Sequence, residues 1–366
     1  MLVSLDIGKA QAMDRAEEAV RLVESAGAKV VETLRGRRDR PDAKTFAGSG
    51  KVEEIRVAVQ QHRAEIVVFD RELGAAQIRN LEAAISAGGE AIQVYDRTDI
   101  ILDIFAQRAR TSEGKLQVEL ARLGHLSTRL VRGWTHLERQ RGSLGKTGGP
   151  GEKQIELDRR MIGERVKKLK DKIRKVGKVR ATQRAGRIRS GVLRVSIVGY
   201  TNAGKSTLFN RLATSKAYAA DQLFATLDTT TRRVFLGEGA QIVLSDTVGF
   251  IRDLPHMLVD AFRATLEETI GADLLLHVVD VASEHRDDQI EAVNMVLAEI
   301  GADEVPQLIV LNQIDRVPGM APEMVRDASG KILNIKVSAI TGAGMDSLRE
   351  VLADVARDAS SYPTAA

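Results

Sequence analysis

The segment 199-GYTNAGKS-206 places the tightest constraint on the fold, because it fits the pattern G-x-x-x-x-G-K-[ST]. An apolar run, LRVSIV at 193–198, precedes it, and an amphipathic stretch, TLFNRLA at 207–213, follows it. Gly199 and Gly204 let the backbone wrap closely around a phosphate and point N–H groups at it. The dipole of a helix that starts near Lys205 would further favour binding of the negatively charged phosphate. The pattern therefore predicts a phosphate-binding loop between a buried strand and a helix.

Four further apolar runs follow along the chain, and helical segments separate them. Such runs are typical of strands buried on both faces of a parallel sheet. Residues 192–359 are therefore predicted to form a doubly wound α/β domain, with a last helix over 345–356 and a disordered tail over 360–366. The four runs are QIVLS at 241–245, LLLHVVD at 274–280, QLIVLN at 307–312 and ILNIKVS at 332–338.

Polar motifs at the ends of these runs occur in the order expected for a GTPase. Lys205 would lie between the β- and γ-phosphates, and the N–H of Gly249 in 246-DTVG-249 would contact the γ-phosphate. We predict Mg²⁺ ligation by the hydroxyls of Ser206 and Thr226 and, through water, by Asp246. Magnesium is thus the expected cofactor.

The segments 312-NQID-315 and 338-SAI-340 would recognise the base. The carboxylate of Asp315 can accept two hydrogen bonds from N1 and N2 of guanine, and adenine offers neither in that arrangement. The N–H of Ala339 could meet the guanine O6. The candidate GTP site comprises Gly199, Tyr200, Thr201, Asn202, Ala203, Gly204, Lys205, Ser206, Thr207, Phe224, Ala225, Thr226, Leu227, Asp228, Asp246, Thr247, Val248, Gly249, Asn312, Gln313, Ile314, Asp315, Ser338, Ala339 and Ile340. Candidate catalytic residues are Lys205, Thr226, Gly249 and Phe250.

The middle of the chain, residues 105–191, carries 24 basic and 8 acidic side chains, whereas the whole chain has a net charge of only +4. Such an excess indicates a surface for a polyanion, and a solvated helical surface is the alternative. Apolar residues repeat there in two heptad patterns, which predicts a long antiparallel helical hairpin. The repeats are Leu116, Leu120, Leu123, Leu130, Trp134 and Leu137, then Ile155, Ile162, Val166, Leu169, Ile173 and Val176.

A glycine-rich connection, 142-GSLGKTGGPG-151, joins the two predicted helices. No helix can continue through it, and it is longer than a reversal of the chain requires. We predict that this tip contacts RNA, with the phosphates bound by Arg139, Arg141, Lys146 and Lys153.

Residues 1–104 alternate strand and helix patterns, which predicts a small α/β domain with parallel pairing. The expected strands are 30–34, 65–69 and 91–95, and the expected helices are 12–26, 49–62 and 75–87. The segment 48-GSGK-51 could hold an anion at a helix start, although a plain turn is the simpler interpretation.

Beyond these motifs, the whole chain resembles the HflX family of ribosome-associated GTPases, and residues 192–359 resemble a Ras-like, translation-factor-class GTPase domain. The resemblance outside that domain lies in 45-TFAGSGKVEEI-55, 70-DRELGAAQIRNLE-82, 97-RTDIILDIFAQRARTSEGKLQVELA-121 and 141-RGSLGKTGGPGEKQIELDRR-160. It implies a GTP-driven factor that binds the 50S ribosomal subunit and its 23S rRNA and separates 70S ribosomes. Asn202 resembles the asparagine that holds K⁺ in some related GTPases.

The sequence departs from the pattern at two motif positions. Gln313 replaces the usual lysine of the base motif, and Phe250 stands where Ras-like proteins often place a glutamine that orients the attacking water. A phenyl ring cannot orient water, so slow intrinsic turnover that rises on the 50S subunit is expected. Many HflX-family members also carry a further small C-terminal domain. None is expected within these 366 residues, and a natural short form and a shortened chain both stay open.

Two other functions remain open at this stage: an RNA chaperone in which nucleotide state is secondary, and a GTPase that assists tRNA modification. Additional ATP hydrolysis also stays open. The chain has no cysteine, which excludes disulfides and thiolate chemistry. Without a signal-peptide pattern or a long apolar run, a cytoplasmic protein is expected, with a peripheral membrane location as a second option. The family resemblance implies that it associates with ribosomes, and a monomer is expected. The six histidines show no metal-ligand spacing, and only His256, in the loop after Gly249, is a candidate for catalysis.

Overall fold

The computed structural model describes the chain except residues 9–11, 87–88, 90, 141–149, 189–190, 215–222, 238, 262 and 362–366. It divides into two compact units, Met1–Gln107 with Val118–Asp171, and Arg108–Gln117 with Lys172–Ala366. Within the described part of the chain, no helix is long and apolar enough to span a lipid bilayer.

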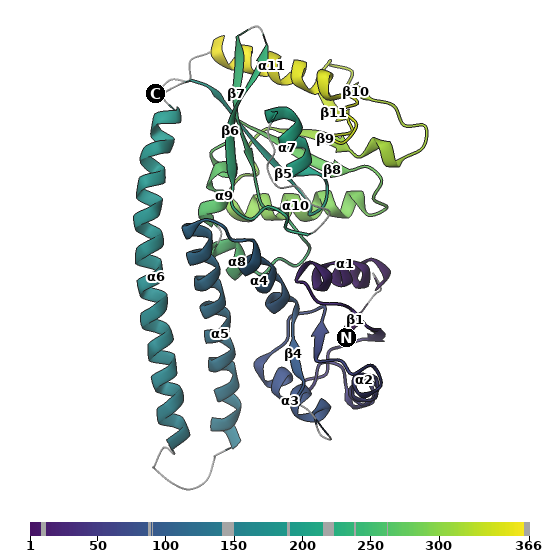
Figure 1. Ribbon diagram of the computed structural model, residues 1–366, viewed down its shortest axis with the longest axis vertical. Helices are drawn as coiled ribbons and strands as arrows, with labels where there is room; N and C mark the ends of the chain where they lie inside the picture. Colours follow the sequence, from purple (N-terminus) through teal and green to yellow (C-terminus); the bar gives the residue numbers. More distant parts are fainter. Residues whose placement is uncertain are drawn as a thin grey trace. The chain divides into compact units, whose positions relative to one another are not determined.

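The first unit contains a four-stranded sheet whose strands are all parallel, in the order β2-β1-β3-β4. Helices α2 and α3 lie next to each other beside this sheet (Figure 1). Their apolar side chains pack against it in its core, where Phe46 and Phe69 are in edge-to-face contact with ring centroids 6.4 Å apart. The elements are β1 (Leu2–Ile7), α1 (Ala12–Ser25), β2 (Thr33–Arg38), α2 (Ser49–His62), β3 (Ile66–Phe69), α3 (Ala75–Ile85), β4 (Gln93–Tyr95) and α4 (Arg97–Arg108).

This sheet confirms the predicted parallel α/β domain, with two differences. The strand β1 was not predicted, because LVSLDI is short and mixes polar with apolar residues, yet it lies inside the sheet. The strand predicted over 30–34 instead spans Thr33–Arg38, whose basic side chains fit an edge position.

Two long helices, α5 (Ser112–Gln140) and α6 (Pro150–Ile188), form the predicted helical hairpin. Over residues 161–176 of α6, Ile162, Val166, Leu169, Ile173 and Val176 are the only side chains that are not exposed. This spacing matches the predicted heptad pattern. Pro150 and Gly151, assigned to the tip by sequence, begin α6, and residues 141–149 lie outside the described part of the chain, as do the side chains of Arg139 and Lys153.

The second unit contains a seven-stranded sheet in the order β10-β11-β9-β8-β5-β7-β6, in which β6 and β10 are antiparallel edge strands. Helices α7 and α11 pack on one face, and α9 and α10 on the other (Figure 1). The elements are β5 (Leu193–Gly199), α7 (Lys205–Ala213), β6 (Thr230–Gly237), β7 (Ala240–Asp246), α8 (His256–Ala261), α9 (Arg263–Ile270), β8 (Leu274–Asp280), α10 (Arg286–Ile300), β9 (Gln307–Asn312), η1 (Ile314–Arg316), β10 (Glu323–Arg326), β11 (Ile332–Lys336) and α11 (Met345–Ser361).

The predicted doubly wound domain is confirmed, and β5, β7, β8, β9 and β11 are the five predicted strands. The two edge strands were not predicted, because their half-exposed, polar sequences lack the continuous apolar pattern of central strands. The last helix extends to Ser361, five residues beyond the predicted end, so residues 360 and 361 are not part of a tail.

His277 on β8 lies in the core of this sheet, where its Nδ1 is 3.1 Å from Oε1 of Gln307. Burial lowers the pKa of the imidazole to about 4, so the ring is neutral at pH 7. The unfolded chain binds this proton near pH 6.5. Stability contributed by the neutral ring is therefore present above that pH and lost as the pH falls toward 4.

We expect the wild-type protein to lose about 2 kcal/mol more stability than a His277→Leu variant between pH 7 and pH 4.5. Urea unfolding at both pH values measures this difference. Equal losses in the two proteins would contradict it.

Candidate nucleotide-binding site

The phosphate-binding loop lies directly after β5, and two of its glycines are required by close packing. Gly199 has φ of 145°, and a Cβ there would lie 2.2 Å from the carbonyl oxygen of Val278. Gly204 has φ of 88°, and a Cβ there would lie 2.3 Å from Nδ2 of Asn312. Both positions exclude side chains, so the loop stays close to the carboxyl ends of β8 and β9.

Lys205 begins α7 and is buried, with 6% of its surface exposed. Its Nζ donates a hydrogen bond to the carbonyl oxygen of Tyr200 at 2.7 Å. Burial lowers the pKa of this ammonium to about 8. A buried cation with one neutral acceptor is suited to an anion, so the side chain is placed for phosphate binding.

The three side chains predicted to bind magnesium lie together. Ser206 Oγ is 2.7 Å from Thr226 Oγ1 and donates to Asp246 Oδ2 at 2.7 Å, and Thr226 Oγ1 lies 3.1 Å from the same carboxylate oxygen. The other oxygen, Asp246 Oδ1, is buried without a hydrogen-bond partner, and burial raises the pKa of this carboxyl. Hard oxygen donors with an unsatisfied carboxylate oxygen fit Mg²⁺.

The loop that carries Thr226 is anchored on both sides of that residue. Phe224 and Leu227 are buried, each with 2% exposure, and Phe224 adopts a left-handed backbone with φ of 54°. Asp228, predicted to be near the nucleotide, directs its carboxylate to the start of α5, where it accepts hydrogen bonds from Arg110 and Thr111.

A short bridge joins the phosphate-binding loop to the segment after β7. The N–H of Thr201 donates to the carbonyl oxygen of Phe250 at 2.7 Å, and the N–H of Phe250 donates to that of Gly199 at 3.1 Å. The ring of Phe250 is fully buried, so it points into the protein. A Cβ on Gly249 would lie 2.9 Å from Thr201 Cγ2 and 3.0 Å from Thr201 Cα, so this close approach of the two segments favours glycine.

The motif at the end of β9 ties three loops together. Asn312 Nδ2 donates to the carbonyl oxygen of Ala203 at 2.9 Å, and Asn312 Oδ1 accepts the N–H of Ala339 at 3.0 Å. Gln313 Nε2 donates to the carbonyl oxygen of Asn202 at 2.9 Å. Sequence reasoning placed Asn312 in the site, but its role as a brace is apparent only from these contacts.

Of the two remaining base-recognition elements, Asp315 has an exposed carboxylate on the short helix η1, and Ile340 is 70% exposed. Ser338 is buried, and its Oγ accepts the N–H of Thr341 at 3.1 Å. The exposed carboxylate and the ordered 338–340 loop are available at the same sheet edge as the phosphate-binding loop, because both follow the carboxyl ends of parallel strands.

The segment 48-GSGK-51 forms a plain helix start. Gly48 precedes α2 with φ of 80°. Lys51 Nζ donates to the carbonyl oxygen of Arg35 at 2.9 Å and pairs with Glu54 at 2.7 Å. The ammonium is therefore already engaged, which favours the structural interpretation of this segment.

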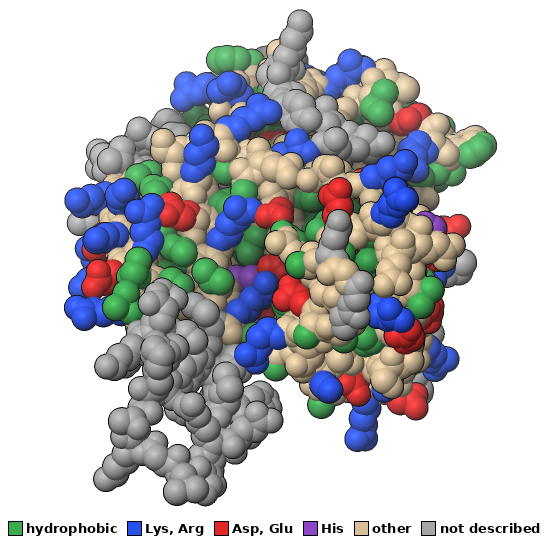
Figure 2. All heavy atoms as spheres, turned by 60° about the horizontal axis from the view of Figure 1, so that its bottom comes forward, with side chains coloured by type: hydrophobic (Ala, Val, Ile, Leu, Met, Phe, Trp, Pro, Cys, Tyr) green, Lys and Arg blue, Asp and Glu red, His purple; other side chains and the backbone are tan. Residues whose placement is uncertain are grey.

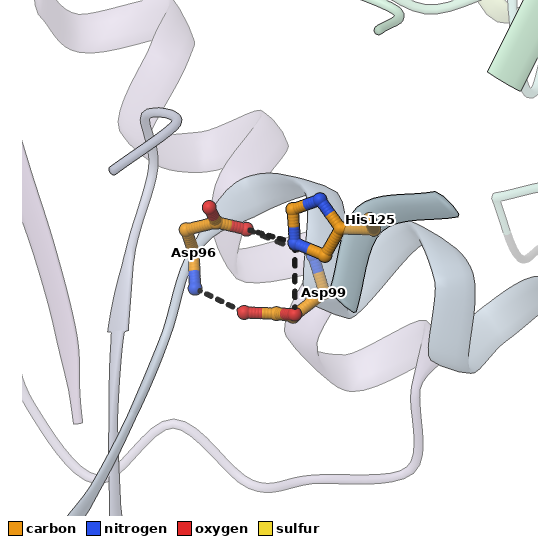
Figure 3. A group of neighbouring side chains, drawn as sticks. All are labelled: Asp96, Asp99 and His125. Atoms are coloured by element: carbon orange, nitrogen blue, oxygen red, sulfur yellow. Dashed lines mark hydrogen bonds and ion pairs between the residues drawn. The ribbon is translucent and has the colours of Figure 1, made fainter. Parts of the chain in front are cut away.

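A cluster of Asp96, Asp99 and His125 in the first unit was not predicted (Figure 3). His125 Nε2 lies 3.2 Å from Asp99 Oδ1 and 3.9 Å from Asp96 Oδ1. Asp96 and Asp99 also accept each other's backbone N–H at the start of α4, at 2.9 and 3.0 Å. This reciprocal pair is a capping box formed by two aspartates. Their spacing of three residues is a sequence signal for the start of a helix.

Arg129 already supplies the cation for this cluster, since its guanidinium lies 3.1 Å from Asp96 Oδ2 and 2.5 Å from Asp99 Oδ2. Burial raises the pKa of the Asp96 carboxyl, whereas hydrogen bonds from His125 and Asp96 and the charge of Arg129 lower that of Asp99. A divalent ion would have to displace or sit beside this guanidinium. The cluster is therefore best described as a buried ion-pair network that fixes α5 to the start of α4.

Comparison with known proteins identifies three family regions. Residues 13–106 match the family described as GTP-binding GTPase N-terminal, residues 108–187 match GTP-binding GTPase Middle Region, and residues 194–313 match 50S ribosome-binding GTPase. A solved structure described as a complex of SsGBP with GDP has the same fold, with a TM-score of 0.51, 24% identity, and 98% of this chain and 99% of that chain covered.

The chain is 51% identical over 354 residues to GTPase HflX of Escherichia coli strain K12, covering 97% of this chain and 82% of that protein. It is 48% identical over 335 residues to GTPase HflX of Magnetococcus marinus, covering 91% of this chain and 75% of that protein. With the phosphate-binding loop and its partner motifs in place, these matches show a P-loop GTP hydrolase of a ribosome-binding class, and the chain belongs to the HflX family of GTPases.

Proposed function

We propose that this GTPase binds the 50S subunit through its hairpin and separates 70S ribosomes in a cycle timed by GTP binding and hydrolysis. The observation that carries the proposal is the connection, in one chain, of a GTP site to a long hairpin that exposes basic side chains. The 50S ribosome-binding description of the matched family supports it.

The helix α6 provides the polycationic surface. Its exposed side chains include Lys and Arg at six of nine consecutive positions. Lys and Arg side chains are numerous on the face of the molecule shown in Figure 2. Such a stripe suits rRNA phosphates, whose binding releases counterions. The six are Lys167, Lys168, Lys170, Lys172, Arg174 and Lys175. The proposed tip contacts by Arg139, Arg141, Lys146 and Lys153 would extend this surface.

At the GTP site, Ser206, Thr226 and Asp246 would hold Mg²⁺, which would supply positive charge to offset that of the phosphates. Lys205 would bind the phosphates through its ammonium group. Asn202 would hold K⁺ beside them, and its backbone φ of 64° lies in the left-handed region. Turnover compared in potassium and sodium buffers tests this ion, and equal rates would exclude it.

Intrinsic hydrolysis should be slow, because the ring of Phe250 is buried and supplies no group to orient water. The large subunit would complete the site by ordering the loops at 223–228 and 249–253. Hydrolysis measured with and without 50S subunits tests this, and equal rates would rule it out.

Sedimentation of 70S ribosomes with the full chain tests the proposed function. We expect subunit peaks to grow with a non-hydrolysable GTP analogue and not with GDP. Replacing 142–151 by a short Gly-Ser linker should abolish splitting and keep intrinsic hydrolysis. Annealing of free RNA without ribosomes, and no nucleotide-dependent splitting, would instead favour an RNA chaperone.

Base selection is expected to depend on Asp315. An Asp315→Asn variant should bind GTP about 2–3 kcal/mol more weakly, because charge-assisted hydrogen bonds to N1 and N2 are lost. It should also gain affinity for xanthosine triphosphate, since an amide can donate to the second carbonyl of xanthine. Competition binding with both nucleotides measures the change. An unchanged preference for GTP would contradict the assignment.

A further inference from the structure

We infer that Asp228 and Thr111 form a joint through which the base of the hairpin helix α5 positions the magnesium-binding residue Thr226. The inference rests on the proposed magnesium role of Thr226. Asp228 and Thr111 act as positioning residues, because neither needs to touch the nucleotide.

The joint consists of three hydrogen bonds to one carboxylate. Asp228 Oδ2 accepts the backbone N–H of Arg110 at 2.7 Å and that of Thr111 at 2.9 Å. Asp228 Oδ1 accepts the hydroxyl of Thr111 at 2.5 Å. A carboxylate at the N-terminal end of a helix is also favoured by the helix dipole. All these groups belong to the second unit.

The helix start is built to receive this carboxylate. Thr111 caps α5, since its Oγ1 accepts the N–H of Gly114 at 2.9 Å and its carbonyl accepts that of Lys115 at 3.1 Å. Its hydroxyl thus accepts from the helix and donates to Asp228. Gly114 leaves room for the carboxylate, because a Cβ at this position would lie 2.3 Å from Asp228 Oδ1.

On the loop side, the spacing from Asp228 to Thr226 is two residues, which span at most about 7 Å. Leu227 between them is buried with 2% exposure and fixes the intervening backbone. Thr230, two residues beyond Asp228, pairs with Asp246 across β6 and β7. The segment 226–230 is therefore held at its start by Ser206 and Asp246, in its middle by α5, and at its end by the sheet.

This arrangement makes the start of α5 part of the GTPase site. A shift of α5 at Thr111 would move Asp228 and, through buried Leu227, Thr226. Conversely, a nucleotide that draws Thr226 toward Mg²⁺ would act on the base of the hairpin. Thermodynamic linkage requires the two effects to be equal in free energy. In the proposed function, binding of the hairpin to the ribosome would change the position of Thr226 in the GTP site through these contacts.

Gly114→Ala tests the joint without replacing any residue of the loop that carries Thr226 and Asp228. Alanine favours a helix over glycine, so α5 itself should not be weakened. The new methyl group should instead displace the Asp228 carboxylate. The matched control is Gly163→Ala on α6, where a Cβ would meet nothing within 4 Å. Both variants gain the same methyl group in a hairpin helix.

The readout is the Mg²⁺ concentration that half-maximally slows release of a fluorescent non-hydrolysable GTP analogue from the full chain. Groups that orient metal ligands change metal affinity or activity 10–100-fold when removed. We expect about a 10-fold rise for Gly114→Ala and for Asp228→Ala, and no change for Gly163→Ala. The pair Thr111→Val and Thr111→Ser provides a second test, in which only valine, lacking the hydroxyl, should raise the requirement.

Thr226→Ala separates failure of the joint from failure of the magnesium assignment. If Thr226→Ala raises the Mg²⁺ requirement while Gly114→Ala and Thr111→Val match the wild type, the joint is wrong and the ligand assignment stands. If Thr226→Ala itself leaves the requirement unchanged, the assignment fails and the inference fails with it.

Discussion

Replacing Lys205 with alanine is expected to lower GTP turnover by about 10³-fold, the effect of removing one strong electrostatic contact from a developing transition state. The ammonium is buried and donates a hydrogen bond to the carbonyl oxygen of Tyr200, and in the proposed site it would bind the phosphates. A water-excluded cation interacts with phosphate more strongly than an exposed one.

The same substitution should change stability little. Burial lowers the pKa of Lys205 to about 8, which means that the folded state holds this charge at a cost. Removing it relieves a desolvation penalty and loses one hydrogen bond, so the two effects oppose each other. Thermal unfolding without nucleotide measures the balance. Replacement of a functional residue often costs little stability, because active sites hold groups that are themselves destabilising.

Lys331→Ala is the matched control, because Lys331 is an exposed lysine of the same unit. It should keep wild-type turnover. Asp246→Ala should resemble Lys205→Ala, since burial also raises the pKa of that carboxyl and its Oδ1 is unpartnered. Wild-type hydrolysis in either site variant would refute the assignment of the phosphate-binding site.

The clustering of the predicted magnesium-binding residues could be predicted from the sequence because each motif is local. Each motif occupies a few residues after an apolar strand, and parallel strands bring their carboxyl ends to one edge. Ser206, Thr226 and Asp246 could therefore be grouped although 40 residues separate the first from the last. The helical hairpin could also be predicted, because a heptad repeat of apolar residues indicates which face of each helix packs against the other helix.

Contacts between side chains of different helices and loops could not be predicted from the sequence, because no local pattern identifies their partners. Asp228 was assigned to the nucleotide because it adjoins Thr226, but its carboxylate binds the start of α5, 117 residues earlier in the chain. Nothing in the spacing distinguishes a side chain facing the nucleotide from one facing the opposite way. Likewise, the capping pair Asp96 and Asp99 is local, whereas its partners His125 and Arg129 come from another helix.

Replacing Arg129 with methionine is expected to destabilise the first unit by about 3–5 kcal/mol, because it leaves buried carboxylates without their cation. Asp96 is fully buried and Asp99 is 15% exposed at the side chain, and Arg129 contacts both. Methionine preserves much of the volume, so loss of charge rather than packing dominates. Hydrogen exchange of the α4 and α5 amides in the full chain measures the effect without requiring the two units to unfold together.

Arg122→Met on the same helix is the matched control, since Arg122 forms an exposed ion pair with Asp103. An exposed pair contributes about 0–1 kcal/mol, so protection should hardly change. Adding Asp99→Asn to Arg129→Met should recover part of the loss, because one uncompensated charge disappears. The loss should also shrink as the pH falls, since burial raises the pKa of Asp96 and protonation removes its charge. Equal protection in the Arg122 and Arg129 variants would show that the network contributes no more than a surface pair.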